Sequence, residues 1–175
     1  AGRSFIQAAT GIGKTMAVLL PAVQSIAAQV SEKVFYLTAR NTGRLAAEKA
    51  VDELRAGGLR LKSLSLTAKE KVCVHPGRAC TPEECDVARG HYDRLPDARR
   101  AAFELDAWTR ETVAEVARRF AVCPFEFALE LSTWADLIVC DYNYAFDPSA
   151  YLRRFFGDEP GDYSFLVDEA HNLVD

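Results

Sequence analysis

The sequence lacks the marks of a membrane or secreted protein. Its longest mainly apolar run, residues 16–30, contains Gln24, Ser25 and Gln29, so it falls short of the ~20 apolar residues that span a bilayer. The first residues show no basic region followed by an apolar one, as a signal peptide would. We find no internal repeat and no low-complexity tract. We therefore expect a globular chain with no membrane partner.

The chain also lacks a net positive charge, so its overall charge does not indicate nucleic-acid binding. The net charge is −4 at pH 7. Residues 55–80 nevertheless hold six basic side chains and one acid, whereas residues 136–175 hold nine acids and two arginines. The basic stretch is either a solvated face or a local surface that follows phosphates. The chain offers no Ser/His/Asp or Cys/His nucleophile arrangement and no nuclease-type carboxylate cluster.

Length and composition are those of an ordinary globular domain. Hydrophobic residues make up 49% of the chain and charged residues 26%. A chain of 175 residues suffices for one domain with a core, or for one domain with an insertion. It has no initial methionine, begins just before a short apolar run and stops directly after a motif. We expect it to be a piece of a longer protein.

A glycine-rich stretch near the amino terminus has the pattern of a phosphate-binding loop. It follows the apolar pair Phe5-Ile6, which we expect to form a strand, and it opens into a helical pattern. Its glycines allow backbone N–H groups to approach a phosphate, and the helix directs its positive end at the same anion. The expected ATP-binding residues are Thr10, Gly11, Ile12, Gly13, Lys14 and Thr15. Lys14 would contact the β- and γ-phosphates and Thr15 would bind Mg²⁺, although Ala8 stands where the usual pattern has its first glycine.

The following residues alternate between strand and helix patterns. Residues 33–38 and 59–66 read as strands, with a helix at 42–56 between them, which predicts a parallel sheet with helices on its faces. The pattern breaks in a loop-rich stretch that is followed by one helical section over residues 96–120. Strand patterns resume at 136–140 and 164–168. Residues 68–121 therefore look like an insertion into an α/β core.

The last strand pattern ends on a pair of acids, Asp168-Glu169, followed by Ala170-His171. An acid at the end of a strand can reach Mg²⁺, and the next one can orient or deprotonate the attacking water. The pair alone could be a solvated acidic turn. Two motifs in this order, each expected after a strand, indicate an ATP site with Asp168 on Mg²⁺ and with Lys14 and Glu169 as catalytic residues.

All five cysteines lie between the two nucleotide motifs, and four of them have the surroundings of metal ligands. Cys73, Cys80 and Cys85 occupy a loop-rich stretch, and Cys123 precedes a proline. Four thiolates can bind either Zn²⁺ or an iron–sulfur cluster, and their spacing alone does not decide between the two. His75 in the same loop is either a ligand or a solvated side chain. A fifth cysteine, at position 140, lies within a strand pattern, so we expect a small buried hydrophobe.

The motifs together resemble a known family. Ala-x-Thr-Gly-x-Gly-Lys-Thr with Asp-Glu-Ala-His-Asn-Leu is similar to the XPD/DinG-like branch of superfamily-2 DNA helicases, in which the alanine at position 8 is normal. The resemblance implies a RecA-like P-loop NTPase motor domain over residues 1–67 and 122–175. It also implies an inserted, mainly helical iron–sulfur domain over residues 68–121. The [4Fe–4S] ligands would be Cys73, Cys80, Cys85 and Cys123, with Zn²⁺ as the alternative.

The same resemblance implies function. The intact enzyme would hydrolyse ATP with Mg²⁺ and move 5′→3′ on single-stranded and forked DNA, in repair or replication. A second motor domain of the same polypeptide would supply arginine fingers, so we expect the 175-residue chain alone to be inactive. The location would be the cytoplasm, at the nucleoid, in a bacterium and the nucleus otherwise. The expected DNA contacts are Arg40, Lys69, Lys71 and Arg78.

Two further segments and two alternative functions complete these expectations. Asp141-Tyr142-Asn143-Tyr144 resembles the family's Tyr-rich segment and either touches DNA or packs, with packing favoured, and His171 would couple the nucleotide site to motifs outside the chain. One alternative function is a zinc-stabilised nucleic-acid-binding module with a vestigial nucleotide site. A second is a remodelling ATPase that does not separate strands.

Overall fold

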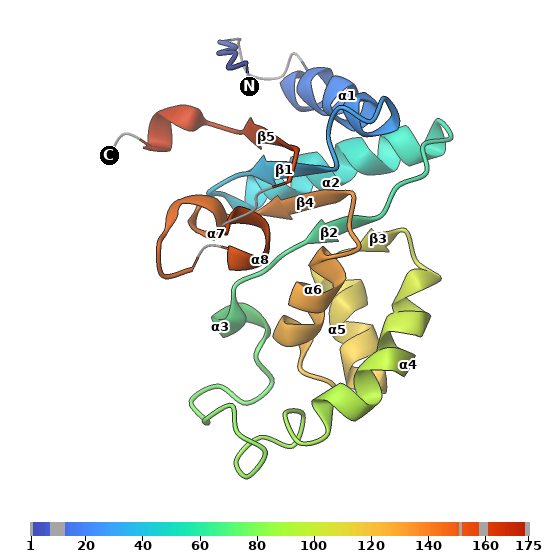
Figure 1. Ribbon diagram of the computed structural model, residues 1–175, viewed down its shortest axis with the longest axis vertical. Helices are drawn as coiled ribbons and strands as arrows, with labels where there is room; N and C mark the ends of the chain where they lie inside the picture. The colour runs from blue at the N-terminus through green and yellow to red at the C-terminus, as the bar shows by residue number, and fades with distance from the viewer. Residues whose placement is uncertain (1, 8–12, 151, 158–160, 174–175) are drawn as a thin grey trace.

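The computed structural model describes residues 2–7, 13–150, 152–157 and 161–173, and a parallel β-sheet lies at its centre (Figure 1). The strands are β1 (Lys33–Leu37), β2 (Ser63–Ser65), β3 (Ala107–Trp108), β4 (Leu137–Cys140) and β5 (Tyr163–Val167). Their order in the sheet is β3-β2-β4-β1-β5, and all four neighbouring pairs are parallel. The expected α/β fold with a parallel sheet is confirmed.

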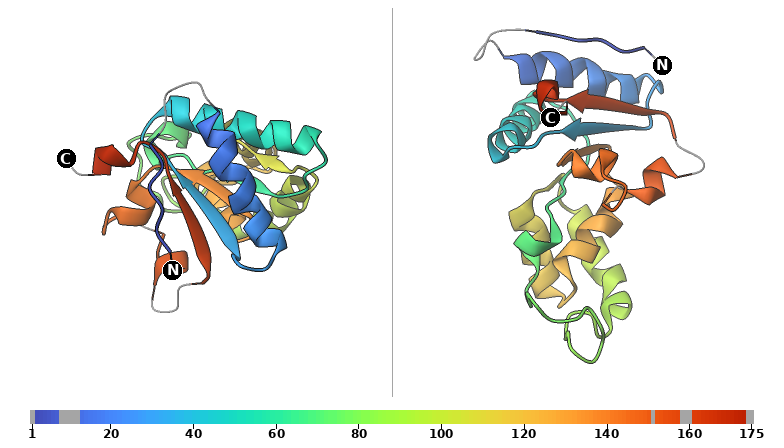
Figure 2. Two further views of the ribbon diagram at one scale, coloured as in Figure 1. Left: turned by 90° about the horizontal axis from the view of Figure 1, so that it is seen from above. Right: turned by 90° about the vertical axis from the view of Figure 1, so that its left-hand side faces the viewer.

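Strand β1 shows why the sheet needs cover on both faces. All five of its residues are buried, and alternate side chains enter different cores. Val34 and Tyr36 pack with α1 (Lys14–Ala27) and α2 (Asn41–Ala56). Phe35 and Leu37 enter the core on the opposite face. Figure 2 shows α1 and α2 together on one side of the sheet. A continuous apolar run is the pattern of such a doubly covered parallel strand.

The second face carries the remaining helices. They are α3 (Lys69–Val72), α4 (His91–Phe103), α5 (Arg110–Arg119), α6 (Pro124–Ser132), α7 (Asn143–Phe146) and α8 (Arg153–Phe156), and a 3₁₀ turn, η1 (Ala170–Leu173), follows β5. Helices α4, α5 and α6 form a lobe below β2 and β3 in Figure 1. The loop between α3 and α4 lies at the far end of this lobe (Figure 1).

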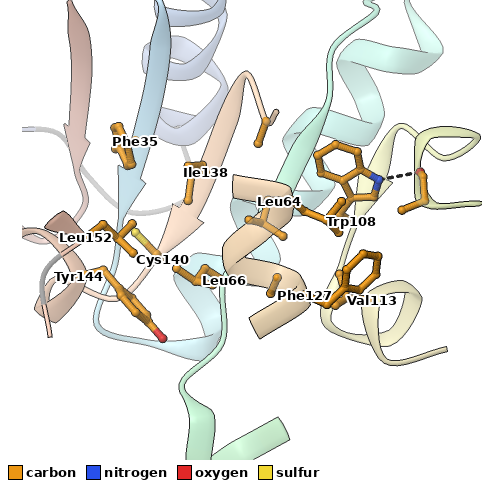
Figure 3. Close-up of a cluster of buried hydrophobic side chains, with 14 of the residues drawn as sticks. Phe35, Leu64, Leu66, Trp108, Val113, Phe127, Ile138, Cys140, Tyr144 and Leu152 are labelled. Carbon is orange, nitrogen blue, oxygen red and sulfur yellow. Dashed lines mark hydrogen bonds between the residues drawn. The ribbon is translucent and has the colours of Figure 1, made fainter. Parts of the chain in front are cut away.

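One continuous core joins this helical lobe to the sheet (Figure 3). Phe127 of α6 and Leu64 of β2 are fully buried in it, and Trp108 of β3 is 1% exposed. The indole Nε1–H of Trp108 donates a hydrogen bond of 2.8 Å to the carbonyl of Ala102 at the end of α4. The lobe and the sheet therefore share buried side chains.

The short strand β3 was not expected, because residues 96–120 read as one helical section. That section is two helices, α4 and α5, with β3 between them. The backbone N–H of Ser63 donates to the carbonyl of Asp106 and joins this segment to β2. Thr109 then caps α5, because its side chain accepts a hydrogen bond from the Thr112 N–H. A two-residue strand made by tertiary pairing leaves no periodic signal in the sequence.

Two other expected strands also differ from the structure. The strand expected over residues 59–66 is confined to Ser63–Ser65. The strand expected at Phe5-Ile6 is absent from the described residues 2–7, which are exposed throughout. Phe5 is 91% exposed and Ile6 is 69% exposed. Two apolar residues bury too little surface to hold this segment against the sheet, where it forms no strand pairing.

Within the described part of the chain, no helix is both long and apolar enough to cross a membrane.

The Trp108 hydrogen bond supplies a test of this fold. Trp108→Phe would remove this buried hydrogen bond and leave a cavity where the larger ring packed, so the free energy of unfolding should fall by about 1–3 kcal/mol, even though the Ala102 carbonyl still accepts from the Leu105 N–H. Trp134→Phe is the matched control, because Trp134 is 49% exposed and its replacement should cost less than about 1 kcal/mol. Urea unfolding followed by circular dichroism measures both values. Equal losses in the two variants would contradict the buried role of β3.

Candidate nucleotide and metal sites

A glycine–lysine–threonine triplet begins helix α1. Gly13 is the N-cap residue, and its φ of 82° and ψ of 25° lie in the left-handed region that glycine tolerates. Lys14 and Thr15 are the first two helical residues, and both are half-buried. The first N–H groups of a helix have no partner within it, so the triplet lies where an anion binds most readily. The expected ATP contacts Thr10, Gly11 and Ile12 lie outside the described residues, as does Ala8.

The acidic pair lies directly after β5. The backbone N–H of Asp168 donates a hydrogen bond of 2.9 Å to the Leu37 carbonyl, which ends the ladder between β5 and β1. Glu169 is exposed, and its φ of 52° is uncommon for a residue other than glycine. Backbone strain of this kind is found mainly at functional sites. The Glu169 carboxylate lies 3.5 Å from Nδ1 of His171.

Tyr36 joins the two parts of this site. It is 2% exposed on β1, and the Thr15 and Asp168 side chains both influence the pKa of its hydroxyl. Burial, followed by the negative charge of Asp168, raises the pKa of Tyr36 to about 12. The phenol is therefore protonated at neutral pH and can donate to the Asp168 carboxylate. The Thr15 and Asp168 side chains thus both act on the Tyr36 phenol, which brings the start of α1 and the end of β5 to one residue of β1.

Tyr142, the N-cap residue of α7 just after β4, supports Asp168. Its hydroxyl donates to the backbone carbonyl of Asp168, and its side chain is 7% exposed. The packing role favoured for Tyr142 therefore agrees with its burial. The sequence reading did not identify Tyr36 as a site residue, because within an apolar strand it reads as core. The available signal was its place one residue before the end of β1, whose neighbour β5 leads directly into Asp168.

The cysteines surround the loop at the end of the helical lobe. Cys73 follows α3 and Cys123 is the N-cap residue of α6, and both are half-buried. Cys80 is exposed, whereas Cys85 is 7% exposed. The expected small buried hydrophobe, Cys140, is 3% exposed in β4.

The ammonium group of Lys69 interacts with three of these cysteines, Cys73, Cys80 and Cys123. A hydrogen bond to Cys80 and the charges of Cys80, Cys73 and Cys123 raise the pKa of Lys69. Burial raises the pKa of the Cys123 thiol, while hydrogen bonds from the Glu126 and Phe125 backbone oppose that shift. An ammonium and a helix amino terminus both favour the thiolate form that binds metals.

One close group of possible metal ligands lies in the cysteine loop. Zn–S bonds of about 2.3 Å in a tetrahedron would bring the sulfurs to within about 3.8 Å of one another. Among the described residues, the group of ligand atoms that lie within 4.8 Å of one another is instead His75, Cys85 and Asp86. His75 Nε2 and Asp86 Oδ1 are already paired at 2.5 Å. Four thiolates are also a donor set that an iron–sulfur cluster accepts, so the chemistry of the cysteines fits a thiolate-bound metal centre.

The basic residues expected to contact DNA follow the carboxyl ends of two strands. Arg40 is exposed at the N-cap of α2, after β1. Lys69 and Lys71 are exposed on α3, after β2, and Arg78 is exposed in the cysteine loop. Carboxyl ends of parallel strands share one edge of a sheet, so Arg40, α3 and the acidic pair lie on the same side of the molecule (Figure 1).

Comparison with known proteins identifies relatives of the chain. The family model DEAD_2 matches residues 44–175. A "Regulator of telomere elongation helicase 1 homolog" of Oryza sativa subsp. japonica is 29% identical over 145 residues, which is 71% of this chain and 13% of that protein. The protein of the same name from Anopheles gambiae is 28% identical over 166 residues, 87% of this chain and 16% of that protein. The chain thus spans less than a fifth of the length of these two relatives.

Solved structures show the same fold. A chain described as "Truncated XPD" matches with a TM-score of 0.63 and 22% identity, over 95% of this chain and 47% of that chain. A second, "XPD_Helicase", matches with a TM-score of 0.60 and 20% identity, over 95% of this chain and 29% of that chain. The expected RecA-like fold and the resemblance to XPD-type superfamily-2 helicases are confirmed. Since the family model matches most of its length, the chain belongs to the DEAD_2 family.

Proposed function

We propose that the chain is the first motor domain of an ATP-dependent DNA helicase. The observation that carries the proposal is the meeting of Thr15 and Asp168 at the Tyr36 hydroxyl. This meeting joins the glycine–lysine–threonine triplet to the acidic pair, although the two are far apart in the sequence. The printed names of the relatives, which are helicases, support the same assignment.

The residues divide the work of phosphoryl transfer to water. Lys14 and the N–H groups at the start of α1 bind the phosphates, as would Thr10, Gly11 and Ile12. Mg²⁺, held by Thr15 and Asp168, would neutralise charge on the β- and γ-phosphates. Glu169 orients the attacking water and accepts its proton. Tyr36 holds the Thr15 hydroxyl and the Asp168 carboxylate in place, while Tyr142 holds the Asp168 backbone.

The rest of the activity belongs to the longer polypeptide. A second motor domain would supply the arginine fingers that complete hydrolysis and would let the protein move 5′→3′ on single-stranded and forked DNA. Arg40, Lys69, Lys71 and Arg78 would contact phosphates. The protein would act in repair or replication, and it would be found at the nucleoid of a bacterium or in the nucleus of a eukaryote.

We also propose that Cys73, Cys80, Cys85 and Cys123 hold a [4Fe–4S] cluster. Its role would be structural, because the loop between α3 and α4 has few buried residues to hold its shape. Residues 68–121 would form the cluster domain, with β3 of that stretch joined to the motor sheet. The alternative of a zinc-stabilised nucleic-acid-binding module is favoured by one observation, the His75–Cys85–Asp86 group.

The nucleotide site is tested in the full-length protein. Lys14→Ala should abolish unwinding of a forked duplex, and Glu169→Gln should keep ATP binding while lowering turnover by roughly 100-fold or more. Lys49→Ala and Glu115→Gln are the matched controls, because both residues are exposed on helices far from the triplet in sequence. ATPase and strand-separation assays measure the effects.

Three outcomes of these assays would count against parts of the proposal. A wild-type protein that hydrolyses ATP without separating strands would be a remodelling ATPase. Unwinding that survives Lys14→Ala would contradict the nucleotide site. The isolated 175-residue chain should bind ATP weakly and hydrolyse it negligibly, so robust DNA-stimulated turnover by that chain would contradict the need for a second motor domain.

The cluster is tested by metal analysis of anaerobically purified protein. We expect a yellow-brown sample with about four iron atoms per chain, as a [4Fe–4S] cluster contains. Cys123→Ser should lose the colour and iron, whereas Cys140→Ala and His75→Ala should keep both. A colourless protein with one zinc atom that is lost in His75→Ala would instead support the zinc-stabilised module.

A further inference from the structure

The hydroxyl of Thr38 links the expected DNA-contacting turn to the expected magnesium ligand. Thr38 directly follows β1 and is 6% exposed. Its Oγ1 accepts a hydrogen bond of 3.4 Å from the Arg40 N–H. The same oxygen lies 3.4 Å from Asp168 Oδ2 and 3.5 Å from the Arg40 carbonyl oxygen, and it can donate to either. The Thr38 hydroxyl proton can therefore go to the Arg40 carbonyl in the expected DNA-contacting turn, or to the Asp168 carboxylate in the expected magnesium site.

Gly43 closes the space around this hydroxyl from the first turn of α2. A Cβ at position 43 would overlap Thr38 Oγ1 and would come within 2.7 Å of Asp168 Oδ2. The helix backbone therefore lies directly against both side chains, without room for a methyl group. Packed elements with no intervening space transmit small displacements. A shift of the amino terminus of α2 must accordingly move Thr38, the Asp168 carboxylate, or both.

We propose that Thr38 and Gly43 are positioning residues that couple the turn at Arg40 to the carboxylate of Asp168. The inference rests on the proposed function, because it takes Arg40 as a phosphate contact and Asp168 as a magnesium ligand. A DNA phosphate that pulls on Arg40 displaces the turn over residues 38–43. The Thr38 hydroxyl then stops donating to the Arg40 carbonyl and donates to the Asp168 carboxylate instead. A charged acceptor makes the stronger hydrogen bond.

This arrangement explains how DNA could stimulate hydrolysis from within one motor domain. The hydrogen bond between Thr38 and Asp168 is long, as such bonds often are in a free enzyme before substrate shortens them. Shortening it would fix the Asp168 carboxylate, which already interacts with the Tyr36 phenol, while Tyr142 holds the Asp168 backbone carbonyl. DNA would then act by completing the set of contacts on one carboxylate.

The test compares three variants and one control in the full-length protein. Thr38→Val removes the hydroxyl but keeps the shape, Thr38→Ser keeps the hydroxyl, and Gly43→Ala fills the space. Gly57→Ala is the control, since the new Cβ there would lie 3.3 Å from its nearest neighbour, the Leu54 carbonyl oxygen, and the backbone φ of −81° is ordinary. ATPase is measured with and without single-stranded DNA across a magnesium titration, and DNA affinity is measured separately without nucleotide.

We expect Thr38→Val to lower the ratio of DNA-stimulated to basal ATPase by roughly 2- to 10-fold, the range set by loss of one hydrogen bond. The magnesium concentration for half-maximal activity should rise by a similar factor. Gly43→Ala should change both quantities in the same direction. Thr38→Ser and Gly57→Ala should match the wild type, and the DNA affinity of all four should stay within about 2-fold of it, less than the loss of one such bond.

The outcomes separate this inference from the proposed function. A wild-type protein without DNA-stimulated ATPase would contradict the proposed function itself. A wild type that is stimulated, with Thr38→Val equal to it in stimulation ratio and magnesium requirement, would overturn the coupling alone. If Gly43→Ala fails to fold, the comparison of Thr38→Val with Thr38→Ser still decides, because a merely structural role would lower the melting temperature without moving either quantity.

Discussion

The pairing of β5 with β1 determines where the chemistry of this domain can take place. In that register Leu37 lies opposite Val167, so Asp168 is the first residue past the ladder and its N–H still binds the Leu37 carbonyl. Strand β1 also carries Tyr36, whose phenol interacts with the Thr15 side chain of α1. A slip of β5 by one residue would turn Asp168 to the other face. The register of β5 on β1 therefore decides whether Asp168 faces Tyr36 and Thr38.

Much of this arrangement was legible in the sequence, for reasons that differ between elements. The apolar run of β1 and the helical spacing of α2 carry strong periodic signals, and both elements lie within one or two residues of their expected positions. The acidic pair was recognisable because its chemistry needs the end of a strand. Strand β3 was not, because it exists only through pairing with β2 and through the Trp108 side chain. The expected strand at Phe5-Ile6 failed because its apolar content is too small to decide its partner.

Contacts made by a site residue with its neighbours were the part the sequence could not show. Tyr36, Thr38, Gly43 and Tyr142 come from three different segments, and no spacing rule connects them to Asp168. Their convergence follows from parallel strands that end at a common edge. The cysteines are the opposite case, since their number predicts a metal centre while the His75–Asp86 pair beside Cys85 was not foreseen. The position of the cysteines at the far end of the helical lobe keeps that chemistry apart from the nucleotide site.

The backbone conformation at position 169 and the chemistry proposed for Glu169 favour different residues. Its φ of 52° is a conformation that glycine would adopt without strain, whereas a glutamate adopts it at some expense of stability. Glycine, however, has no carboxylate to orient water. The residue that the turn would prefer is thus not the residue that the proposed hydrolysis would require.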